Sequence, residues 1–470
     1  GLVTRRQELL TYLTTHKLVE EIDSLAKDGA NREMGLAQFL AENGLLPMFG
    51  MPTRVRNLYL NLESVGENES EWDSVDREID IAIYEFSPGQ VVIRDKQIHE
   101  SIGFTDQLGF VQPGHGGTKL IPEPKPQWWS DKVSIADCPN CGALKLTTQN
   151  DGAVQCDDCQ KNLPQEAFST YYSPSAFRTD FRPQVSDGTE PHRPMMRRET
   201  GAIIAPMTMK EVIGTNLSVA SGKEAYIIRR NRGVLDIDGN SKSYEIVHRT
   251  QNKVYCQGNP KLNIEKVPNQ AILLDKAEKN PMYWQVQPEL PQIEEVRLFS
   301  RKRTDALNLS MLTIGTGLSM DRLGTQLERS GTSLRAAAIS ATQLIIQRAS
   351  LALDISPEEF EPLEPRLRDG KPILQIADTL VNGAGFCQKL TKDIEGKTPL
   401  IVELIDSMLN DPSDPMVGSF FESKHRDECH RSCYRCIQRY GNRGYHGLLD
   451  WRLGLSFLRC LFDPTHRVGL

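Results

Sequence analysis

The chain has 470 residues, of which 39% are hydrophobic and 25% charged, and its formal net charge at pH 7 is −7. This length predicts several domains, and the acidic balance excludes a protein coated with nucleic acid, so any such contact must come from local basic patches. Eight of the ten cysteines can be placed in two metal-like clusters, with Cys387 counted in the second, which favours zinc sites in a reducing cytoplasm over disulfides. No sequence typical of a signal peptide or a membrane span is visible.

Residues 1–46 carry apolar side chains at helical spacing, for example Leu9, Leu10 and Leu13. We expect two or three amphipathic helices whose apolar faces pack together. The chain lacks an initiator methionine at Gly1, and we expect it to be a piece of a longer polypeptide.

Residues 47–130 are expected to form a small β-rich domain, either a barrel or a sheet. Ile79, Ile81 and Ile83 alternate with polar residues as in a half-buried strand, and a Ser-Pro-Gly turn separates them from the apolar residues 91–93. The pair Trp128-Trp129 could stack on bases, although such a pair more often caps the core of a small domain.

Residues 131–168 contain two C-x-x-C pairs, Cys138 with Cys141 and Cys156 with Cys159. This spacing predicts a zinc ribbon, in which each pair supplies two thiolates and short strands join the pairs. Four thiolates leave no open coordination position, so the zinc ion should be structural. A redox dithiol would need one such pair, not two.

Residues 169–300 are predicted to hold an Arg- and aromatic-rich linker followed by a second β-rich domain. Interleaved cations and rings, which include Arg178 and Arg182, are typical of grooves that bind single-stranded nucleic acid. An irregular linker packed on a domain has the same composition, and both interpretations stay open. Short apolar runs at 225–228 and 271–274 predict strands.

Residues 301–470 are expected to form a C-terminal α/β domain. A basic cluster at 301–305 leads into an apolar run, and a long helix is predicted over Thr332–Leu353, with Pro357 just beyond it. A buried strand at 373–378, a Gly-Ala-Gly turn and a helix then follow, as in α/β sheets.

This C-terminal domain contains a second cysteine cluster, Cys429, Cys433 and Cys436. Thiolates at C-x3-C-x2-C spacing can face one zinc ion from a tight turn, but zinc needs a fourth ligand. We favour Cys387, at the start of the helix after the Gly-Ala-Gly turn. His425, His430 and Asp427, all close to the cluster in sequence, are also candidates. Three buried cysteines without a metal are a further possibility.

The stretch from Lys424 to Arg467 has nine Lys or Arg against four Asp or Glu. This local excess predicts a path for a nucleic-acid strand; the candidate contacts are Arg431, Arg435, Arg439, Tyr440 and Arg443. A solvated basic face beside a structural zinc site is the alternative. Trp451 lies in an apolar helical stripe and is expected in the core.

Catalytic motifs are not evident. The sequence Asp427-Glu428-Cys429-His430 matches a helicase D-E-x-H box, but no buried strand precedes it and no phosphate loop occurs upstream. We therefore expect no catalytic residue in this chain. Its predicted fold class is α+β or α/β multidomain, with N-terminal helices, a small β domain with a zinc ribbon, and a C-terminal α/β domain with a second cysteine-zinc site.

Several stretches resemble the C-terminal region of MrfA-like superfamily 2 DNA helicases, a family whose relatives include the large helicase of Druantia and the B component of DISARM, two bacterial antiphage systems. The matching stretches are LPMFGMPTRVRNLY (46–59), REIDIAIYEFSPGQ (77–90), the two C-x-x-C pairs, SPSAFRTDFRP (173–183), RKRTDALNL (301–309), TSLRAAAISATQLIIQRASLALDISPEEFE (332–361), NGAGFC (382–387) and CHRSCYRCIQRYGNRGYHGLLDWRLGL (429–455).

The resemblance implies a zinc site at the second cluster, a place beside a helicase motor, and contact with DNA that is single-stranded or partly unwound. Both motor domains are missing from this sequence, so ATP and magnesium would bind only in a motor supplied by the same polypeptide or by another subunit. We therefore expect an accessory region of an ATP-dependent DNA helicase in antiphage defence or DNA repair, with other defence proteins as partners. A docking subunit that resembles DISARM B, without DNA contact, is the alternative.

Overall fold

The structure is a computed structural model of the chain. It describes residues 54–64, 70–108, 112–113, 119–120, 127–147, 154–157, 159–182, 184–185, 193–204, 209–257, 263–286, 293–323, 331–392 and 398–466. The helices predicted over residues 1–46 lie outside these ranges. The described residues from Arg54 onward belong to one compact unit.

An eight-stranded sheet contains a small closed barrel. Its strands are β1 (Val55–Ser64), β2 (Ser70–Glu78), β5 (Gly103–Thr105), β13 (Ala176–Arg178), β20 (Tyr244–Gln257), β21 (Asn263–Leu273), β22 (Trp284–Val286) and β23 (Glu294–Val296). The order β1-β13-β5-β21-β20 returns to β1 through the parallel pair Leu62 with Cys256, so five strands form a ring. The predicted barrel is present, but it takes strands from both segments that were expected to form separate β domains.

Helix α4 (Ile79–Glu85) stands where the sequence predicted a strand, and that prediction is wrong. Ile79, Ala82 and Ile83 are buried, whereas Ile81 is 43% exposed. Buried positions three and four residues apart define a helical face. Ile79 and Ile83 are four residues apart, which fits both one turn of a helix and the same face of a strand.

Smaller elements surround the barrel. These are the three-stranded sheet β14-β4-β3 (Gln184–Val185, Gln97–Glu100 and Val91–Arg94), helix α5 (Leu274–Lys279), and the two-stranded pairs β6 with β7 (Gln112–Pro113 and Lys119–Leu120) and β18 with β19 (Val234–Leu235 and Ser241–Lys242). Trp128 is buried and its ring stacks on Phe104 at 4.6 Å, as expected for a core residue.

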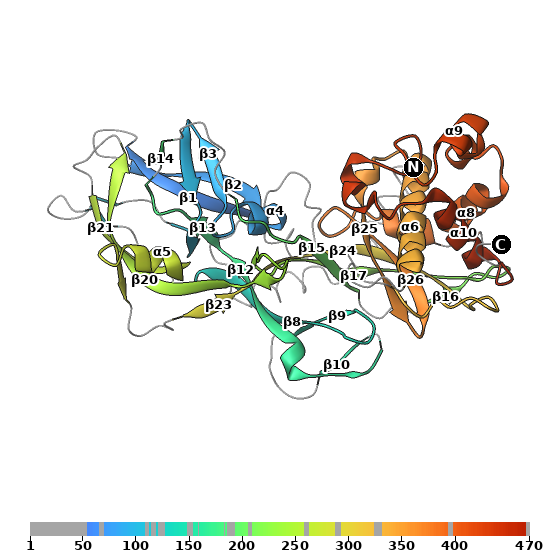
Figure 1. Ribbon diagram of the computed structural model, residues 1–470, viewed down its shortest axis with the longest axis horizontal. Helices are drawn as coiled ribbons and strands as arrows, with labels where there is room; N and C mark the ends of the chain where they lie inside the picture. The colour runs from blue at the N-terminus through green and yellow to red at the C-terminus, as the bar shows by residue number, and fades with distance from the viewer. Residues whose placement is uncertain are drawn as a thin grey trace, which may run out of the picture. The chain divides into compact units, whose positions relative to one another are not determined.

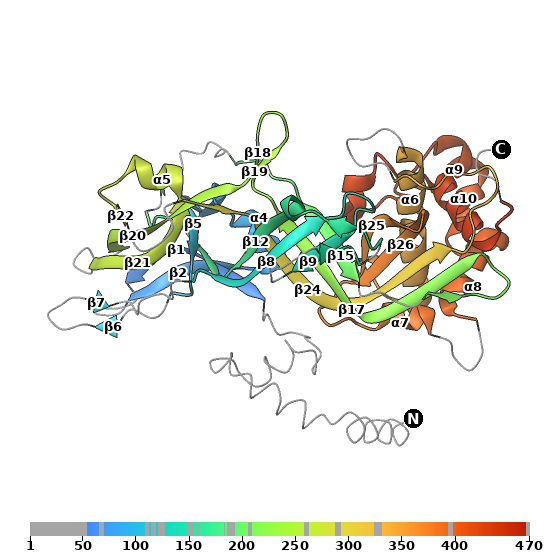
Figure 2. The same cartoon turned by 90° about the horizontal axis from the view of Figure 1, so that it is seen from below.

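A nine-stranded sheet forms the other half of the compact unit. Its strands are β8 (Trp129–Asp137), β9 (Leu144–Thr147), β12 (Phe168–Pro174), β15 (Glu199–Ile204), β16 (Lys210–Glu211), β17 (Leu217–Asn231), β24 (Leu298–Met311), β25 (Phe360–Arg368) and β26 (Lys371–Asp378). Strands β17 and β24 run antiparallel side by side along nearly their whole length (Figure 2). The start of β24 pairs with β12, and its later part pairs with β26.

Helices cover the end of this sheet that contains β25 and β26 (Figure 1). They are α6 (Thr332–Leu353), α7 (Phe386–Thr391), α8 (Leu400–Asn410), α9 (Ser423–Glu428) and α10 (Trp451–Phe462), with the 3₁₀ turns η3 (Pro357–Glu359), η4 (Val417–Phe421) and η5 (Tyr440–Tyr445). A further 3₁₀ turn, η2 (Gln165–Ala167), directly precedes β12. The predicted bounds of α6 are confirmed. The strand, turn and helix from β26 to α7 are also confirmed, but β26 pairs antiparallel, unlike the strands of a parallel α/β sheet.

Helix α6 is the central helix of this part. By length and composition alone it could cross a membrane, but 78% of its apolar window is buried inside the protein. It packs closely on α10, because a Cβ atom at Gly454 would lie 2.8 Å from Leu344 Cδ1 and 3.0 Å from Ser340. Glycine therefore lets the two helices approach each other.

A buried ionic network connects α4 to strands β17, β24 and β25. The Asp80 carboxylate accepts hydrogen bonds from Arg54 at 3.0 Å and from Ser300 at 2.7 Å, and lies 3.5 Å from Arg229. Arg229 also binds Glu361 at 2.7 Å. Burial opposes the charge on Asp80, but Arg54, Ser300 and the neighbouring cations outweigh it and lower its pKa.

We predict that Asp80→Asn lowers the free energy of unfolding by about 3 kcal/mol, because it leaves buried cations without their anion. Because the folded pKa of Asp80 is lowered, its contribution is present above the ordinary carboxyl pKa and is lost as pH falls through the folded value. Urea unfolding at pH 7 and near pH 3 should show the difference shrinking at the lower pH.

The matched control is Glu85→Gln in the same helix, since the Arg77–Glu85 pair is roughly half exposed on both sides. Its effect should stay within about 0.5 kcal/mol. Equal losses in both variants would contradict a special role for the buried network.

Candidate metal centres and nucleic-acid interface

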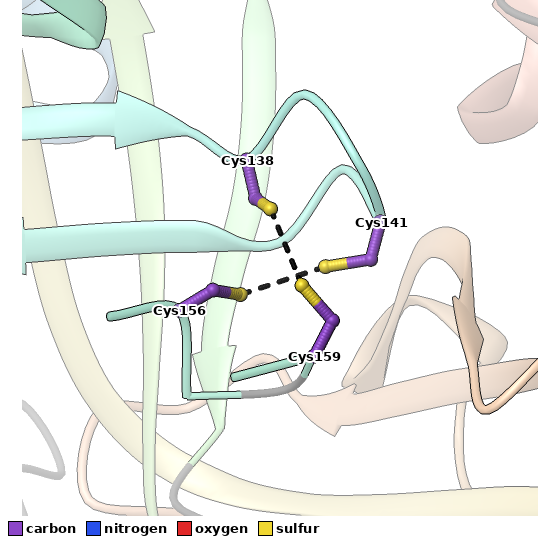
Figure 3. Close-up of side chains that lie close together, drawn as sticks. All are labelled: Cys138, Cys141, Cys156 and Cys159. Carbon is purple, nitrogen blue, oxygen red and sulfur yellow. Dashed lines mark hydrogen bonds between the residues drawn. The ribbon is translucent and has the colours of Figure 1, made fainter. Parts of the chain in front are cut away.

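The four cysteines of the predicted ribbon point toward one another (Figure 3). Cys138 Sγ lies 3.6 Å from Cys159 Sγ, and Cys141 Sγ lies 3.5 Å from Cys156 Sγ. A disulfide requires an S–S distance of about 2.05 Å. Thiolates that surround zinc at about 2.3 Å stand roughly 3.8 Å apart in a tetrahedron. The geometry fits a four-thiolate metal ion, and we call these residues the first centre.

Two similar turns build the first centre. In one, the Gly142 N–H donates to the Cys138 carbonyl at 2.8 Å, and in the other the Gln160 N–H donates to the Cys156 carbonyl at 3.0 Å. Both Gly142 and Gln160 have positive φ, which turns the chain back so that both sulfurs of a pair face inward. Strands β8 and β9 flank the first turn, and the short strands β10 (Val154–Gln155) and β11 (Asn162–Leu163) flank the second.

The first centre is attached to the nine-stranded sheet by charge as well as by backbone pairing. Asp137, directly before Cys138, accepts hydrogen bonds from Arg230 at 2.8 and 3.0 Å and from Arg232 at 2.7 Å. Burial opposes the charge on Asp137, but the two guanidinium groups lower its pKa. The ribbon is therefore an extension of the sheet through β8 and β12.

The thiols of the first centre differ in acidity. Burial raises the pKa of Cys141 well above its usual range. Burial opposes ionisation of Cys159 as well, but the backbone N–H of Lys161 and neighbouring side chains outweigh it and lower its pKa to about 7. Metal binding requires all four thiolates, so it must displace protons and weaken at acidic pH.

The second centre consists of His425, Cys429, Cys433 and Cys436, whose ligand atoms all lie within 4.8 Å of one another. Cys436 Sγ lies 3.9 Å from Cys429 Sγ and 3.8 Å from Cys433 Sγ, and His425 Nε2 lies 3.4 Å from Cys433 Sγ. With Zn–N near 2.05 Å, a tetrahedral site predicts roughly 3.6 Å between sulfur and nitrogen. The residues fit a three-thiolate, one-imidazole metal ion.

The prediction of Cys387 as the fourth ligand is wrong. Its thiol lies in the apolar core and contacts the Ile376 carbonyl at 3.6 Å, away from the three clustered sulfurs. Burial, with Asp378 beside it, raises its pKa well above the usual range, so it holds its proton. His430 and Asp427 are exposed and lie outside the cluster, which leaves His425 as the candidate fourth ligand.

His425 is oriented for coordination. Its Nδ1 lies 3.0 Å from the Phe420 carbonyl, which can only accept, so Nδ1 carries the proton and Nε2 presents a lone pair. The sequence contained a signal for this ligand: His425 precedes Cys429 by four residues, which is one turn of helix α9.

The thiols of the second centre differ in acidity, as those of the first centre do. Burial opposes ionisation of Cys433, but the backbone N–H of Arg435 and the His425 side chain outweigh it and lower its pKa to about 7. Burial raises the pKa of Cys436 to about 12, although backbone N–H groups of Cys433 and Ile437 act in the opposite direction.

The loop that follows the second centre is held on α6 and β25. Asn442 is buried and donates to Gln343 of α6 at 2.9 Å and to the Ile437 carbonyl at 2.8 Å. The Tyr445 hydroxyl donates to Glu364 of β25 at 3.1 Å. Tyr445 is thereby fixed inside, whereas Tyr440 is 77% exposed.

The predicted nucleic-acid contacts in this region surround the second centre. Arg431 donates to the Gly447 carbonyl at 2.8 Å, and Arg435 pairs with Glu428 at 2.7 Å. Arg443 donates to the Tyr440 hydroxyl at 2.9 Å, with its guanidinium 4.8 Å from the centre of that ring. All three arginines are exposed, and Arg439 is half-buried.

Arg178 is not available for a nucleic-acid contact, and its prediction is wrong. It is fully buried, donates to Gln270 of β21 at 2.7 Å, and donates to Gln251 of β20. Burial lowers its pKa to about 9. Arg182, by contrast, is exposed and its guanidinium lies 3.2 Å from the Tyr283 ring centre.

Asp427 and Glu428 end the short helix α9, where a helicase box would follow a buried strand. This placement agrees with the rejection of a D-E-x-H box from the sequence.

No family model and no curated protein matches the chain. Among solved structures, the DUF1998 helicase MrfA bound to DNA is similar with a TM-score of 0.34 and 8% identity, over 87% of this chain and 33% of that one. The chain thus spans about a third of the length of that helicase. A TM-score this low does not establish a common fold.

We predict that Cys156→Ser removes one zinc ion per chain and unfolds the ribbon locally. Structural zinc in small fingers contributes roughly 10–16 kcal/mol of binding free energy, and three remaining thiolates cannot retain most of it. Metal analysis of purified protein should fall from two zinc ions to one. An unchanged zinc content would contradict the first centre.

We also predict that His425→Ala and Cys433→Ser each remove the zinc ion of the second centre, whereas Cys387→Ser keeps both ions. The reason is the geometry that places the imidazole, and not the Cys387 thiol, beside the three sulfurs. Zinc content together with circular dichroism tests this. Loss of zinc from Cys387→Ser with retention in His425→Ala would reverse the ligand assignment.

Proposed function

We propose that this chain is a nucleic-acid-binding, zinc-containing accessory region of an ATP-dependent DNA helicase. Its DNA contacts would lie on the surface around the second centre, formed by Arg431, Tyr434, Arg435, Arg439, Tyr440 and Arg443; we call this the zinc-loop surface. The observation that carries the proposal is a set of exposed cations and rings on a loop fixed by a metal centre and by α6.

The two tyrosines suit unpaired bases. Tyr434 is 70% and Tyr440 77% exposed, and each ring is held by a neighbour. Tyr440 has Arg443 against it, and Tyr434 meets His446 edge-on at 5.5 Å. A fixed, exposed ring stacks on a base with little loss of entropy, and each such contact contributes roughly 1–3 kcal/mol. This supports single-stranded or partly unwound DNA as the substrate.

The charges of the zinc-loop surface suit phosphates. The chain is acidic overall, with a net charge of −7, so contact with DNA requires a local basic surface such as this one. Arg435 pairs with Glu428, whose negative charge offsets its own. Arg431 and Arg443 donate to a carbonyl and to a hydroxyl, which are neutral, so their positive charge attracts phosphate more strongly than that of Arg435.

The motor and the pathway are further parts of the proposal. The motif resemblance to MrfA-like helicases supports a motor that lies in the same polypeptide or in a partner subunit, where ATP and magnesium would bind. It also supports a role in antiphage defence or DNA repair, and the cysteine clusters support a cytoplasmic location. Phage plating and survival after DNA damage, in a host strain with and without the gene, separate these two roles.

We predict that the zinc-loaded chain binds a fluorescent single-stranded oligonucleotide more tightly than the same sequence as a duplex. Affinity should fall steeply with salt, because phosphate contacts release counterions. Tyr440→Ala should weaken binding about tenfold with an unchanged salt slope, whereas Arg431→Ala with Arg443→Ala should reduce the slope. Fluorescence anisotropy across a salt titration measures both.

Two exposed residues away from this surface serve as controls: Tyr226→Ala on β17 and Arg77→Ala on β2. Neither should change the affinity measurably. If folded, zinc-loaded protein binds no oligonucleotide at low salt, the chain is instead a docking or regulatory subunit, which is the second function that its sequence allows.

A further inference from the structure

The first residues of helix α10 donate hydrogen bonds to the loop that contains the cysteines of the second centre. The Trp451 backbone N–H donates to the Arg431 carbonyl at 3.0 Å. The Arg452 guanidinium donates to the carbonyls of Cys429 at 2.8 Å, His430 at 3.0 Å and Arg426 at 2.8 Å. The first two residues of α10 thus hold residues 426–431, the segment that contains Cys429.

The Trp451 side chain is fixed in this position from several sides. Its ring meets Phe421 edge-on at 5.4 Å, Phe420 at 5.7 Å and the ligand His425 at 5.8 Å. The Arg452 guanidinium lies 4.3 Å from the ring centre. The indole is 2% exposed, so the position of its polar edge is determined by packing.

The indole nitrogen of Trp451 is buried, and among the described residues it has no acceptor at full hydrogen-bonding geometry. Such an orphaned donor is costly and calls for an explanation. Trp451 lies in the same buried cluster as Cys429, and its side chain interacts with the Cys429 sulfur. A thiolate held by a metal ion is a stronger acceptor than a neutral thiol, so Cys429 as a metal ligand would provide the acceptor that this N–H lacks.

The other two sulfurs already receive backbone donors. The Cys433 N–H donates to Cys436 Sγ at 3.1 Å, and the backbone N–H of Arg435 donates to the Cys433 sulfur. Three thiolates exceed the charge of a divalent ion by one, so each donor to sulfur stabilises the loaded centre. For Cys429, that donor is a side chain that comes from a different helix.

We propose that Trp451 is a positioning residue of the second centre, whose indole N–H donates a hydrogen bond to the metal-bound thiolate of Cys429. This inference rests on the second centre holding a metal ion, as in the function proposed above. It assigns to Trp451 a role beyond filling the core. It also means that loading of the second centre is coupled to the docking of α10.

The sharpest test replaces Trp451 with 3-benzothienylalanine, an isostere in which sulfur takes the place of the N–H. The shape and the packing stay, and only the donor is lost. We expect zinc affinity at the second centre, measured by chelator competition, to fall about tenfold, in the range typical of lost outer hydrogen bonds. The sulfur-to-cobalt charge-transfer band of the Co²⁺ protein should move to lower energy, because the thiolate becomes more electron-rich.

The charge-transfer band of the second centre is obtained by subtracting the spectrum of Co²⁺-loaded Cys433→Ser protein, in which only the first centre binds metal. The same isostere at Trp128, a core residue of the barrel region, is the matched control and should leave zinc affinity and spectrum unchanged. In ¹¹³Cd-loaded wild-type protein, the Trp451 indole proton should show coupling to cadmium across the hydrogen bond.

The proposal would be overturned if the Trp451 isostere kept the wild-type zinc affinity and an unshifted band, or if the cadmium coupling were absent. Trp451 would then only fill the core. Wild-type protein that holds only one zinc ion would overturn it at an earlier step, because the second centre would then not bind metal. DNA binding is a separate measurement, so its failure would contradict the zinc-loop surface without affecting this result.

Discussion

The long antiparallel pairing of β17 with β24 is the constraint on which most of this structure depends. From Leu217 opposite Met311 to Asn231 opposite Leu298, the two strands share one ladder, with one irregularity after Gly222. Near its start, β24 pairs with β12, which pairs with β8, the strand that leads into the first centre. The later part of β24 pairs with β26, and α6, which holds the loop of the second centre, packs on β26. A single strand therefore fixes the foundations of both metal centres.

Each centre brings together four side chains that could hold one metal ion, which is the pattern of structural zinc. The first centre is joined to the sheet through Asp137, and the second is enclosed by α9, α10 and the loop on α6. The second centre differs in presenting exposed rings and cations around it, which is why the proposed DNA contacts lie there.

Sequence reasoning succeeded where the chemistry is local. The two C-x-x-C pairs, the helix Thr332–Leu353 and the strand before the Gly-Ala-Gly turn depend on residues close together in the chain, so their spacing was informative. It failed where tertiary contacts decide. The Cys387 thiol looked available but lies in the apolar core. Arg178 looked like a surface cation, but it is a buried residue of β13 that donates to side chains of β20 and β21. For α4, two periodicities fitted the same isoleucines, and only packing distinguished them.

The closure of the small barrel through Leu62 and Cys256 has a consequence for how the chain is made. Strand β1 leaves the ribosome long before β20, the strand that closes the ring. The apolar side chains of β1 therefore lack this partner during much of synthesis. Contacts of such sequence separation slow folding and expose unpaired edges to aggregation. The ligands of the first centre, all within 138–159, can assemble during that interval. The first centre can therefore form before the barrel closes.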